Sequence, residues 1–255
     1  MDNFFVMIAL LTDFGTKDYF VGAMKGAILS INENAKIIDI THEIEPQNIA
    51  SASFTLRVCY KNFPQKTIFV AVVDPGVGSN RRAILVETEH YYFIAPDNGL
   101  LSFVYEEAES FRVFELTNEK YFAEKVSATF HGRDLFAPFA AHLSKGISAN
   151  EFGAEIQEFT QNSTENNEPK IIHIDRFGNL ITNLKRENLP ENFALEIGGK
   201  RIEKLQNFYA KAAKSEVFMI FGSAGFLEIV VFQDSAQEIL NAKNGQVVKV
   251  SVARP

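Results

Sequence analysis

The apolar residues in the first half of the chain follow two alternating patterns. Residues 4–11, 36–40 and 67–73 are short, mostly apolar runs, which is typical of strands buried on both faces. Residues 19–31 and 49–60 lie between these runs and repeat apolar side chains at helical spacing. The order strand, helix, strand, helix, strand predicts a mostly parallel sheet with helices packed on its faces.

Shorter elements continue this pattern. Residues 82–87 and 91–95 predict a hairpin next to the parallel strands, and residues 113–116 predict another short strand. Residues 135–143 then predict a helix. Together these elements define an expected α/β domain over residues 1–156.

The composition changes after this domain. Residues 157–169 are polar, nearly free of aliphatic side chains, and end in proline, which predicts a linker. In residues 170–255 the periodicity becomes that of short strands separated by glycine turns, such as Gly198-Gly199. This second domain is therefore expected to be a small antiparallel barrel or sandwich.

Composition and charge exclude several classes of protein. The net charge is −7 and no run of Lys or Arg occurs, which argues against a nucleic-acid partner. A single cysteine, Cys59, excludes an intramolecular disulfide and leaves too few thiols for a cysteine-based zinc site. No apolar run is long enough to span a bilayer, and residues 4–11 lack the basic leader of a signal peptide. We expect a cytoplasmic protein with no membrane partner.

The strongest candidate for chemistry follows the third apolar run. Asp74 ends this run and is followed by Pro75-Gly76-Val77-Gly78, a turn that breaks the strand. Open α/β sheets bind ligands at the carboxyl ends of their strands, where Asp74 is expected. Arg81 comes seven residues later and is a cation able to pair with this carboxylate. The alternative is a surface turn whose aspartate caps the next element.

Other polar turns carry further candidates. Asp13 follows the first strand, Asp97-Asn98 follows the predicted hairpin, and His131 precedes Arg133-Asp134 at the start of the last helix. The chain contains no dinucleotide fingerprint, phosphate-binding loop or GxSxG nucleophile elbow. What remains is a set of carboxylates, an arginine and a histidine, suited to orienting a small polar reactant.

Three alternatives stay open at this point. His131 could be an ordinary core histidine, and Arg133 with Asp134 could be a local ion pair. Asp13, Asp74 and His131 could instead be the ligands of a metal-dependent phosphohydrolase. A non-catalytic protein that binds a nucleoside is the third alternative.

Seven short motifs, spread in order over most of the chain, resemble one known family. They are LLTDFG (10–15), THEI (41–44), VDPGVGS (73–79), APDNG (95–99), TFHGRD (129–134), DRFGNLITN (175–183) and FGSAGFLEI (221–229). The chain resembles the S-adenosyl-L-methionine (SAM) hydroxide adenosyltransferases, or SAM hydrolases, which are related to the SAM-dependent halogenases. The resemblance implies an α/β N-terminal domain with a mostly parallel sheet, an all-β C-terminal barrel, and a homotrimer with active sites between subunits.

The same resemblance implies an activity and roles for particular residues. Water or hydroxide would attack the ribose C5′ of SAM, giving adenosine and L-methionine, with SAM as the substrate and no cofactor. The residues implied in catalysis are Asp74, Arg81 and His131. The residues implied in substrate binding are Asp13 for the ribose hydroxyls, Asp175 for the methionine ammonium, Ser223 for its carboxylate, Asn179 and Phe130 for adenine and ribose, and Asn98.

A few positions favour the hydrolase over the halogenase alternative. The halogenases carry tyrosines at the positions of Asp74 and His131, and the fluorinating enzymes a serine at Gly132. An aspartate at position 74 repels an anion, which disfavours halide binding. The chain departs from the family at residues 231–233, where an asparagine is common.

Overall fold

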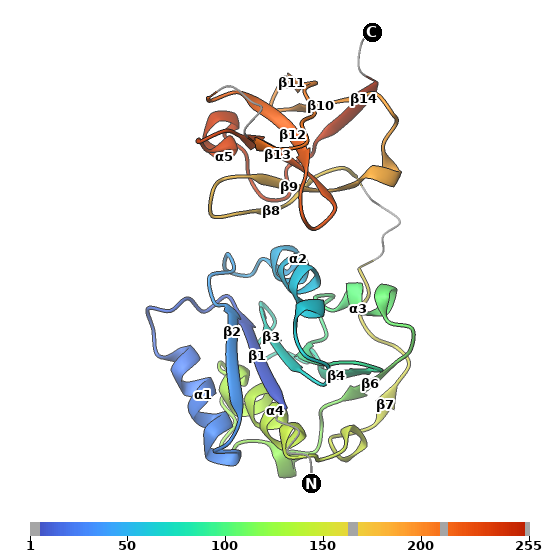
Figure 1. The fold of residues 1–255 in the computed structure, drawn as a ribbon. Coiled ribbons are helices and arrows are strands. Elements are labelled where there is room, and N and C mark those ends of the chain that lie inside the picture. The colour runs from blue at the N-terminus through green and yellow to red at the C-terminus, as the bar shows by residue number, and fades with distance from the viewer. Residues whose placement is uncertain (1–5, 163–167, 210–213, 253–255) are drawn as a thin grey trace. The chain divides into compact units, whose positions relative to one another are not determined.

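The computed structural model describes residues 6–162, 168–209 and 214–252, which belong to two compact units, residues 1–162 and 163–255 (Figure 1). The middle of the expected linker, residues 163–167, lies outside the described residues, as do residues 4 and 5 of the expected first strand.

The first unit is built on a sheet of seven strands. In spatial order these are β2 (Lys36–Thr41), β1 (Met7–Thr12), β3 (Ile68–Val72), β5 (Tyr92–Pro96), β4 (Ala83–Thr88), β6 (Phe111–Glu115) and β7 (Glu155–Ile156). Pairing is parallel from β2 to β5 and antiparallel from β5 to β7. The predicted parallel sheet is therefore confirmed for its centre, and the hairpin of β4 and β5 extends it as an antiparallel flank.

Helices cover both faces of this sheet (Figure 1). α1 (Phe20–Ile31) and α4 (Ala137–Ser144) pack on one face, and α2 (Ile49–Cys59) and α3 (Ser102–Glu107) pack on the other. Because side chains alternate along a strand, Ile8 and Leu10 of β1 enter the first core while Ala9 and Leu11 enter the second. Burial on both faces explains why the central strands read as continuous apolar runs.

Several short helical turns complete the first unit. Three are 3₁₀ turns, at Tyr60–Asn62, Glu119–Tyr121 and Ala149–Glu151. The chain enters α4 through a π-helical turn, Gly132–Phe136, where the sequence predicted the start of a regular α-helix. Such turns are rare and occur preferentially at functional sites.

The first part of the expected linker packs on the first unit. Phe159 lies against the core that α2 and α3 cover. The Thr160 N–H donates to the Asp97 carboxylate at 2.7 Å, and the Asn162 N–H donates to Ser102 Oγ at 2.9 Å. Residues 159–162 are thus held by specific contacts, which a polar composition alone does not predict.

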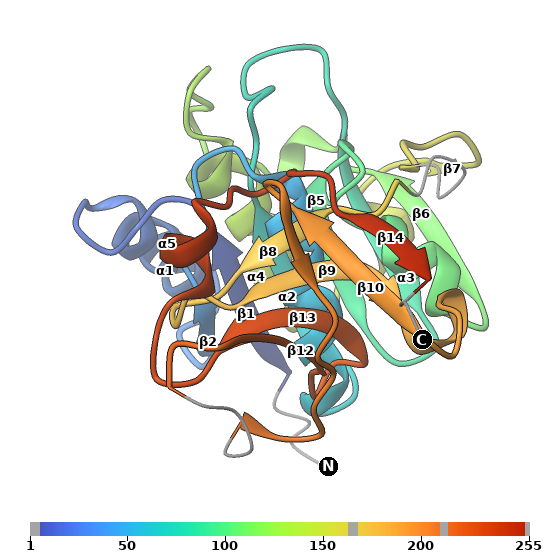
Figure 2. The ribbon, with the colours of Figure 1, turned by 90° about the horizontal axis from the view of Figure 1, so that it is seen from above.

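The second unit consists of two small, largely antiparallel sheets, drawn from above in Figure 2. One contains, in order, β12 (Val217–Phe221), β13 (Phe226–Val231), β9 (Leu180–Lys185) and β8 (Ile171–Ile174), and the other β11 (Lys200–Ile202), β10 (Phe193–Ile197) and β14 (Lys249–Val252). A 3₁₀ turn, Arg186–Asn188, and the helix α5 (Ala236–Leu240) connect strands.

The predicted antiparallel β structure is confirmed, but the described strands do not form one closed barrel. Single-residue bridges, Lys170–Val247 and Leu205–Met219, join the edges of the two sheets, and regular pairing stops there. Side chains of both sheets meet in one shared core. The unit therefore combines two packed sheets whose edges are joined by a shared core and by backbone hydrogen bonds, such as Val248 N–H to Pro169 O and Met219 N–H to Lys204 O.

Candidate active site

Asp74 and Arg81 form a nearly buried ion pair at the carboxyl end of β3. Arg81 Nε lies 3.0 and 2.9 Å from the two carboxylate oxygens of Asp74, and Arg81 Nη2 also donates to Oδ2. The side chains are 5% exposed for Asp74 and 11% for Arg81, so little water screens the pair. The Arg81 guanidinium also lies over the Phe136 ring, 5.3 Å from its centroid. Asp74 therefore does not cap a following element; it anchors an arginine.

His131 continues this array from a distant part of the chain. Arg81 Nη2 lies 2.8 Å from His131 Nδ1. A guanidinium only donates hydrogen bonds, so Nδ1 accepts and the proton of the neutral imidazole resides on Nε2. Burial, together with the charge of Arg81, lowers the pKa of His131 below its ordinary value. His131 is therefore a neutral hydrogen-bond donor at neutral pH.

Two tight approaches hold the loops that carry these side chains. Gly78 has a φ of +79°, and a Cβ there would lie 2.4 Å from the carbonyl oxygen of Ala128. Only glycine allows the loop after β3 to approach the segment before Phe130 so closely. Arg133 and Asp134 form a local ion pair, Nε to Oδ1 2.5 Å, in which Asp134 also accepts from the Ser127 N–H. The local interpretation of Arg133 and Asp134 therefore agrees with the structure.

Asp13 lies at the end of β1 in the same cavity. Its carboxylate accepts a hydrogen bond from the Gln47 N–H at 2.8 Å. Burial raises the pKa of Asp13, and the negative charge of Asp74 adds to this effect. Gln47 has a φ of +67°, a conformation that is costly for a residue other than glycine and that points its N–H at Asp13.

Aromatic side chains form the apolar wall of this cavity. The ring centroid of Phe130 lies 5.1 Å from that of Phe20 and 5.9 Å from that of Phe14, both in edge-to-face arrangements. Asp13, Asp74, His131 and these rings line a cavity of about 400 Å³. The structure thus brings together five of the residues that the sequence singled out, of which Arg81 supports the cavity through Asp74 and His131.

Asn98 lies outside the residues that line this cavity. Its Nδ2 donates to the carbonyl oxygen of Val73 at 2.9 Å, and its Oδ1 accepts from the Leu100 N–H at 3.2 Å. The side chain thus ties the loop after β5 to the residue that precedes Asp74. In this structure the Asn98 side chain fixes the loop that carries Asp74.

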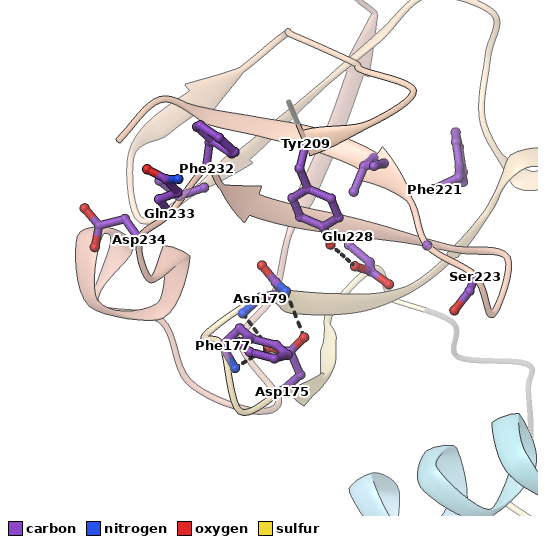
Figure 3. A pocket seen from close by; sticks show the side chains of 13 residues that line it. Asp175, Phe177, Asn179, Tyr209, Phe221, Ser223, Glu228, Phe232, Gln233 and Asp234 are labelled. Atoms are coloured by element: carbon purple, nitrogen blue, oxygen red, sulfur yellow. Dashed lines mark hydrogen bonds between the residues drawn. The ribbon is translucent and has the colours of Figure 1, made fainter. Parts of the chain in front are cut away.

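The second unit contains the other three expected residues in a cavity of about 830 Å³ (Figure 3). Asp175 accepts from the N–H groups of Phe177 and Asn179, at 2.8 and 2.9 Å, and from Asn179 Nδ2 at 2.8 Å. Gly178 has a φ of +78°, and a Cβ there would lie 2.1 Å from Ser235 Oγ. Ser223 lies exposed in the turn between β12 and β13.

The sequence analysis missed two acidic residues of this cavity, Glu228 and Asp234. Glu228 of β13 has a half-buried carboxylate, and a Cβ on Gly222 would lie only 1.7 Å from its Oε1. The Tyr209 hydroxyl donates to Glu228 across 3.4 Å. Burial and the neighbouring Asp175 raise the pKa of Glu228 above its ordinary value. Glu228 lies inside the last of the seven motifs, residues 221–229, and this was the signal in the sequence that could have identified it as a site residue.

Within residues 6–162, 168–209 and 214–252, no three His, Cys, Asp or Glu side chains are grouped as a metal site would require. In the same part of the chain, no helix is long and apolar enough to cross a membrane.

Fold and site together define a protein with an α/β unit, whose parallel strands end at an Asp-Arg-His array, and an antiparallel β unit with an acidic cavity. The chain belongs to the SAM hydroxide adenosyltransferase family. The model of that family's N-terminal domain matches residues 8–153, and the model of its C-terminal domain matches residues 169–249.

Individual proteins agree with this assignment. The chain is 39% identical over 256 residues to the (R)-S-adenosyl-L-methionine hydrolase of Methanocaldococcus jannaschii, with 94% of each chain covered. It is 28% identical over 219 residues to a fluorinase of an Actinoplanes species, covering 72% of this chain and 74% of that one. A crystal structure of an uncharacterised conserved protein from Thermotoga maritima superimposes with a TM-score of 0.87 at 35% identity, covering 96% of this chain and all of the other.

Proposed function

We propose that this protein hydrolyses SAM to adenosine and L-methionine by attack of water at the ribose C5′. The observation that carries the proposal is the hydrogen-bonded array of Asp74, Arg81 and His131 beside Asp13, in a cavity walled by aromatic rings. The family membership of both units supports the same reaction.

The reaction does not require a general acid from the protein. As the C5′–O bond forms, the C5′–S bond breaks and its electron pair returns to sulfur. The sulfonium leaves as a neutral thioether, so no acid needs to protonate it. The protein must instead align one water opposite sulfur and accept its proton.

The geometry favours a different role for each of His131, Asp74 and Arg81. His131 carries its proton on Nε2 and so donates a hydrogen bond that orients the water. Asp74 Oδ1 accepts one hydrogen bond, from Arg81 Nε, whereas Oδ2 accepts two. Oδ1 therefore keeps an open lone pair and takes the proton of the water, which is later released to solvent. Arg81 fixes both partners through Nη2.

This arrangement disfavours a halide as the nucleophile. The positive charge of Arg81 is already neutralised by Asp74 at hydrogen-bonding distance. A halide approaching C5′ would meet the Asp74 carboxylate, which repels it, and no Lys or Arg is present among the described residues that line this cavity. We therefore assign this chain to the hydrolytic branch, although it is also similar in sequence to fluorinases.

The remaining roles concern the two ends of the substrate. Asp13 accepts hydrogen bonds from the ribose hydroxyls, and Phe130 contacts the nucleoside. Asn179 contributes at the nucleoside end, while Asp175 and Ser223 hold the ammonium and carboxylate of methionine. We assign Glu228 to the methionine ammonium as well. The Asp175 carboxylate already accepts three hydrogen bonds and has little acceptor capacity left for the ammonium. As the resemblance implies, we propose a homotrimer whose sites lie between subunits.

The names of the hydrolase relatives suggest which form of SAM is the substrate. Several are (R)-S-adenosyl-L-methionine hydrolases, which specifies one configuration at a sulfonium centre. We extend this preference to the present chain. A site that aligns C5′, sulfur and water can discriminate between sulfonium configurations, because each places the methionine chain in a different direction.

Incubation of the purified protein with the separated (R) and (S) sulfonium forms of SAM tests the proposal. Each form is supplied with and without chelator and with and without fluoride or chloride, and products are identified by chromatography. Adenosine and methionine from the (R) form, unaffected by chelator or halide, are expected. A halogenated nucleoside would identify a halogenase, loss with chelator a metal enzyme, and bound adenosine without turnover a binding protein. Faster turnover of the (S) form would contradict the stereochemical preference.

A further inference from the structure

A loop that contacts Asp13 and its neighbours in the sequence has no role in the proposed reaction. This loop, residues 42–47, follows β2 and contains most of the THEI motif. It contacts the turn at residues 12–16 in four places: Gly15 N–H to His42 O (2.7 Å), Gln47 N–H to Asp13 Oδ2 (2.8 Å), Thr16 Oγ1 to Glu43 Oε1 (3.0 Å), and Thr12 Oγ1 to His42 Nδ1 (2.9 Å).

The contact between Thr12 and His42 is the buried one. Thr12 is fully buried, and His42 is 4% exposed. The Thr12 hydroxyl oxygen also accepts a hydrogen bond from the Phe14 N–H at 3.2 Å, which spans Asp13. His42 Nε2 lies 3.1 Å from Asp39 Oδ1, a distance typical of an ion pair but without hydrogen-bond alignment.

The Thr12 hydroxyl links two segments of the chain, because it pairs with His42 Nδ1 and its oxygen also accepts from the Phe14 N–H. It thereby joins the backbone next to Asp13 to the loop after β2. Removing it would leave His42 Nδ1 and the Phe14 N–H unpaired in a buried place, which is costly.

We infer that Thr12 and His42 are positioning residues that hold the Asp13 carboxylate in place for the ribose hydroxyls. The inference rests on the role proposed above for Asp13. Such support is needed because Asp13 is partly buried and repelled by the charge of Asp74. The Gln47 N–H donates to the carboxylate itself, and the Thr12 hydroxyl fixes the backbone that carries it through the Phe14 N–H.

Calorimetric binding to the full-length protein of adenosine and of 2′,3′-dideoxyadenosine, which lacks both ribose hydroxyls, tests this role. Thr12→Val removes the hydroxyl at nearly constant shape, and Thr12→Ser is the matched control that keeps it. We expect Thr12→Val to weaken adenosine about tenfold, as loss of one hydrogen bond does, and to leave dideoxyadenosine within about twofold. Thr12→Ser should bind both like the unaltered protein. Equal weakening of both ligands, or none, would overturn the inference.

A second pair of variants keeps the test decisive if Thr12→Val does not fold. His42→Asn keeps an acceptor near the place of Nδ1, whereas His42→Leu removes it. We expect His42→Leu to lose discrimination between the two nucleosides and His42→Asn to retain most of it. Equal discrimination by the two would contradict the inference. The outcome does not depend on turnover, so a protein that binds adenosine selectively but fails to hydrolyse SAM would refute the proposed reaction and leave this inference standing.

Discussion

The two cavities differ in whether a cation of the protein balances their carboxylates before any ligand arrives. In the first unit, Asp74 is paired with Arg81, Arg81 contacts His131, and Asp13 accepts a backbone hydrogen bond. In the second unit, three acidic side chains line the cavity, and no Lys, Arg or His is present among its described lining residues. Glu228 has one long hydrogen bond, from Tyr209.

This difference suggests that the first cavity positions the reacting atoms, whereas the second contributes to the affinity for the substrate. A satisfied array is rigid and gains little from binding a ligand, but it holds a reacting atom in one place. A carboxylate with a raised pKa and few partners gains when a cation arrives, and so contributes to affinity. We therefore expect changes in the first cavity to appear mainly in kcat and changes in the second mainly in KM.

The largest expected effect comes from Asp74→Asn. Asparagine keeps the shape of the side chain but cannot accept the proton of the water, and it leaves Arg81 without its counter-charge. We expect kcat to fall about 10²- to 10⁴-fold, the range typical of a lost general base, while SAM affinity changes far less. Single-turnover rates and equilibrium binding measure the two separately. Comparable losses in both would make Asp74 a binding residue and remove the contrast between the cavities.

The pH profile of kcat/KM should show the second effect. His131 must be neutral for its Nδ1 to accept from Arg81, and its pKa lies below the ordinary value of about 6.5. Activity attributable to His131 is therefore complete above that pH and declines as pH falls through the lowered pKa, by up to about tenfold per unit. This acid limb should be absent in the residual activity of His131→Gln. A limb that rises toward acid pH would mean that the charged imidazole is the active form.

Glu228→Gln tests the second cavity. The variant keeps the size of the side chain and removes the charge, so we expect the KM for SAM to rise about tenfold with kcat nearly unchanged. Asp234→Asn is the matched control, because it removes another acid of the same cavity whose carboxylate already accepts from Ser215 and Ser235. Equal effects of the two variants would indicate general electrostatic attraction instead of a specific contact.

The sequence predicted most strands of the first unit because apolar runs mark both the fully buried strand β3 and the partly exposed edge strand β2. The runs at residues 36–40 and 67–73 correspond to β2 and β3 within one residue at each end. The helix α3 was missed, since six residues are too few for a periodic pattern. Closure of the second unit depends on which strand edges meet, and hydrophobic periodicity carries no information on such non-local pairing.

The site was predictable where its contacts are local or depend on side-chain type. Asp74 and Arg81 lie seven residues apart across one turn, and their charges suggested a pair. His131 is fifty positions from Arg81, and only the resemblance connected them. The contact between Gln47 and Asp13 could not be predicted from the sequence, because it is made by the backbone N–H of Gln47 and not by its side chain. A residue's type does not reveal such a role.

The smallest expected effect is that of Asn98→Ala. The sequence analysis assigned Asn98 to the substrate, whereas in the structure its amide holds the Val73 carbonyl behind Asp74. Loss of this hydrogen bond should lower the free energy of unfolding by about 1 kcal/mol, measured by urea denaturation, and lower kcat slightly as the Asp74 loop loosens. The KM for SAM should stay the same, because the side chain lies outside the cavity lining. A several-fold rise in KM at unchanged stability would instead show that Asn98 contacts the substrate. The first cavity would then contribute to substrate affinity through its side chains, as we expect of the second.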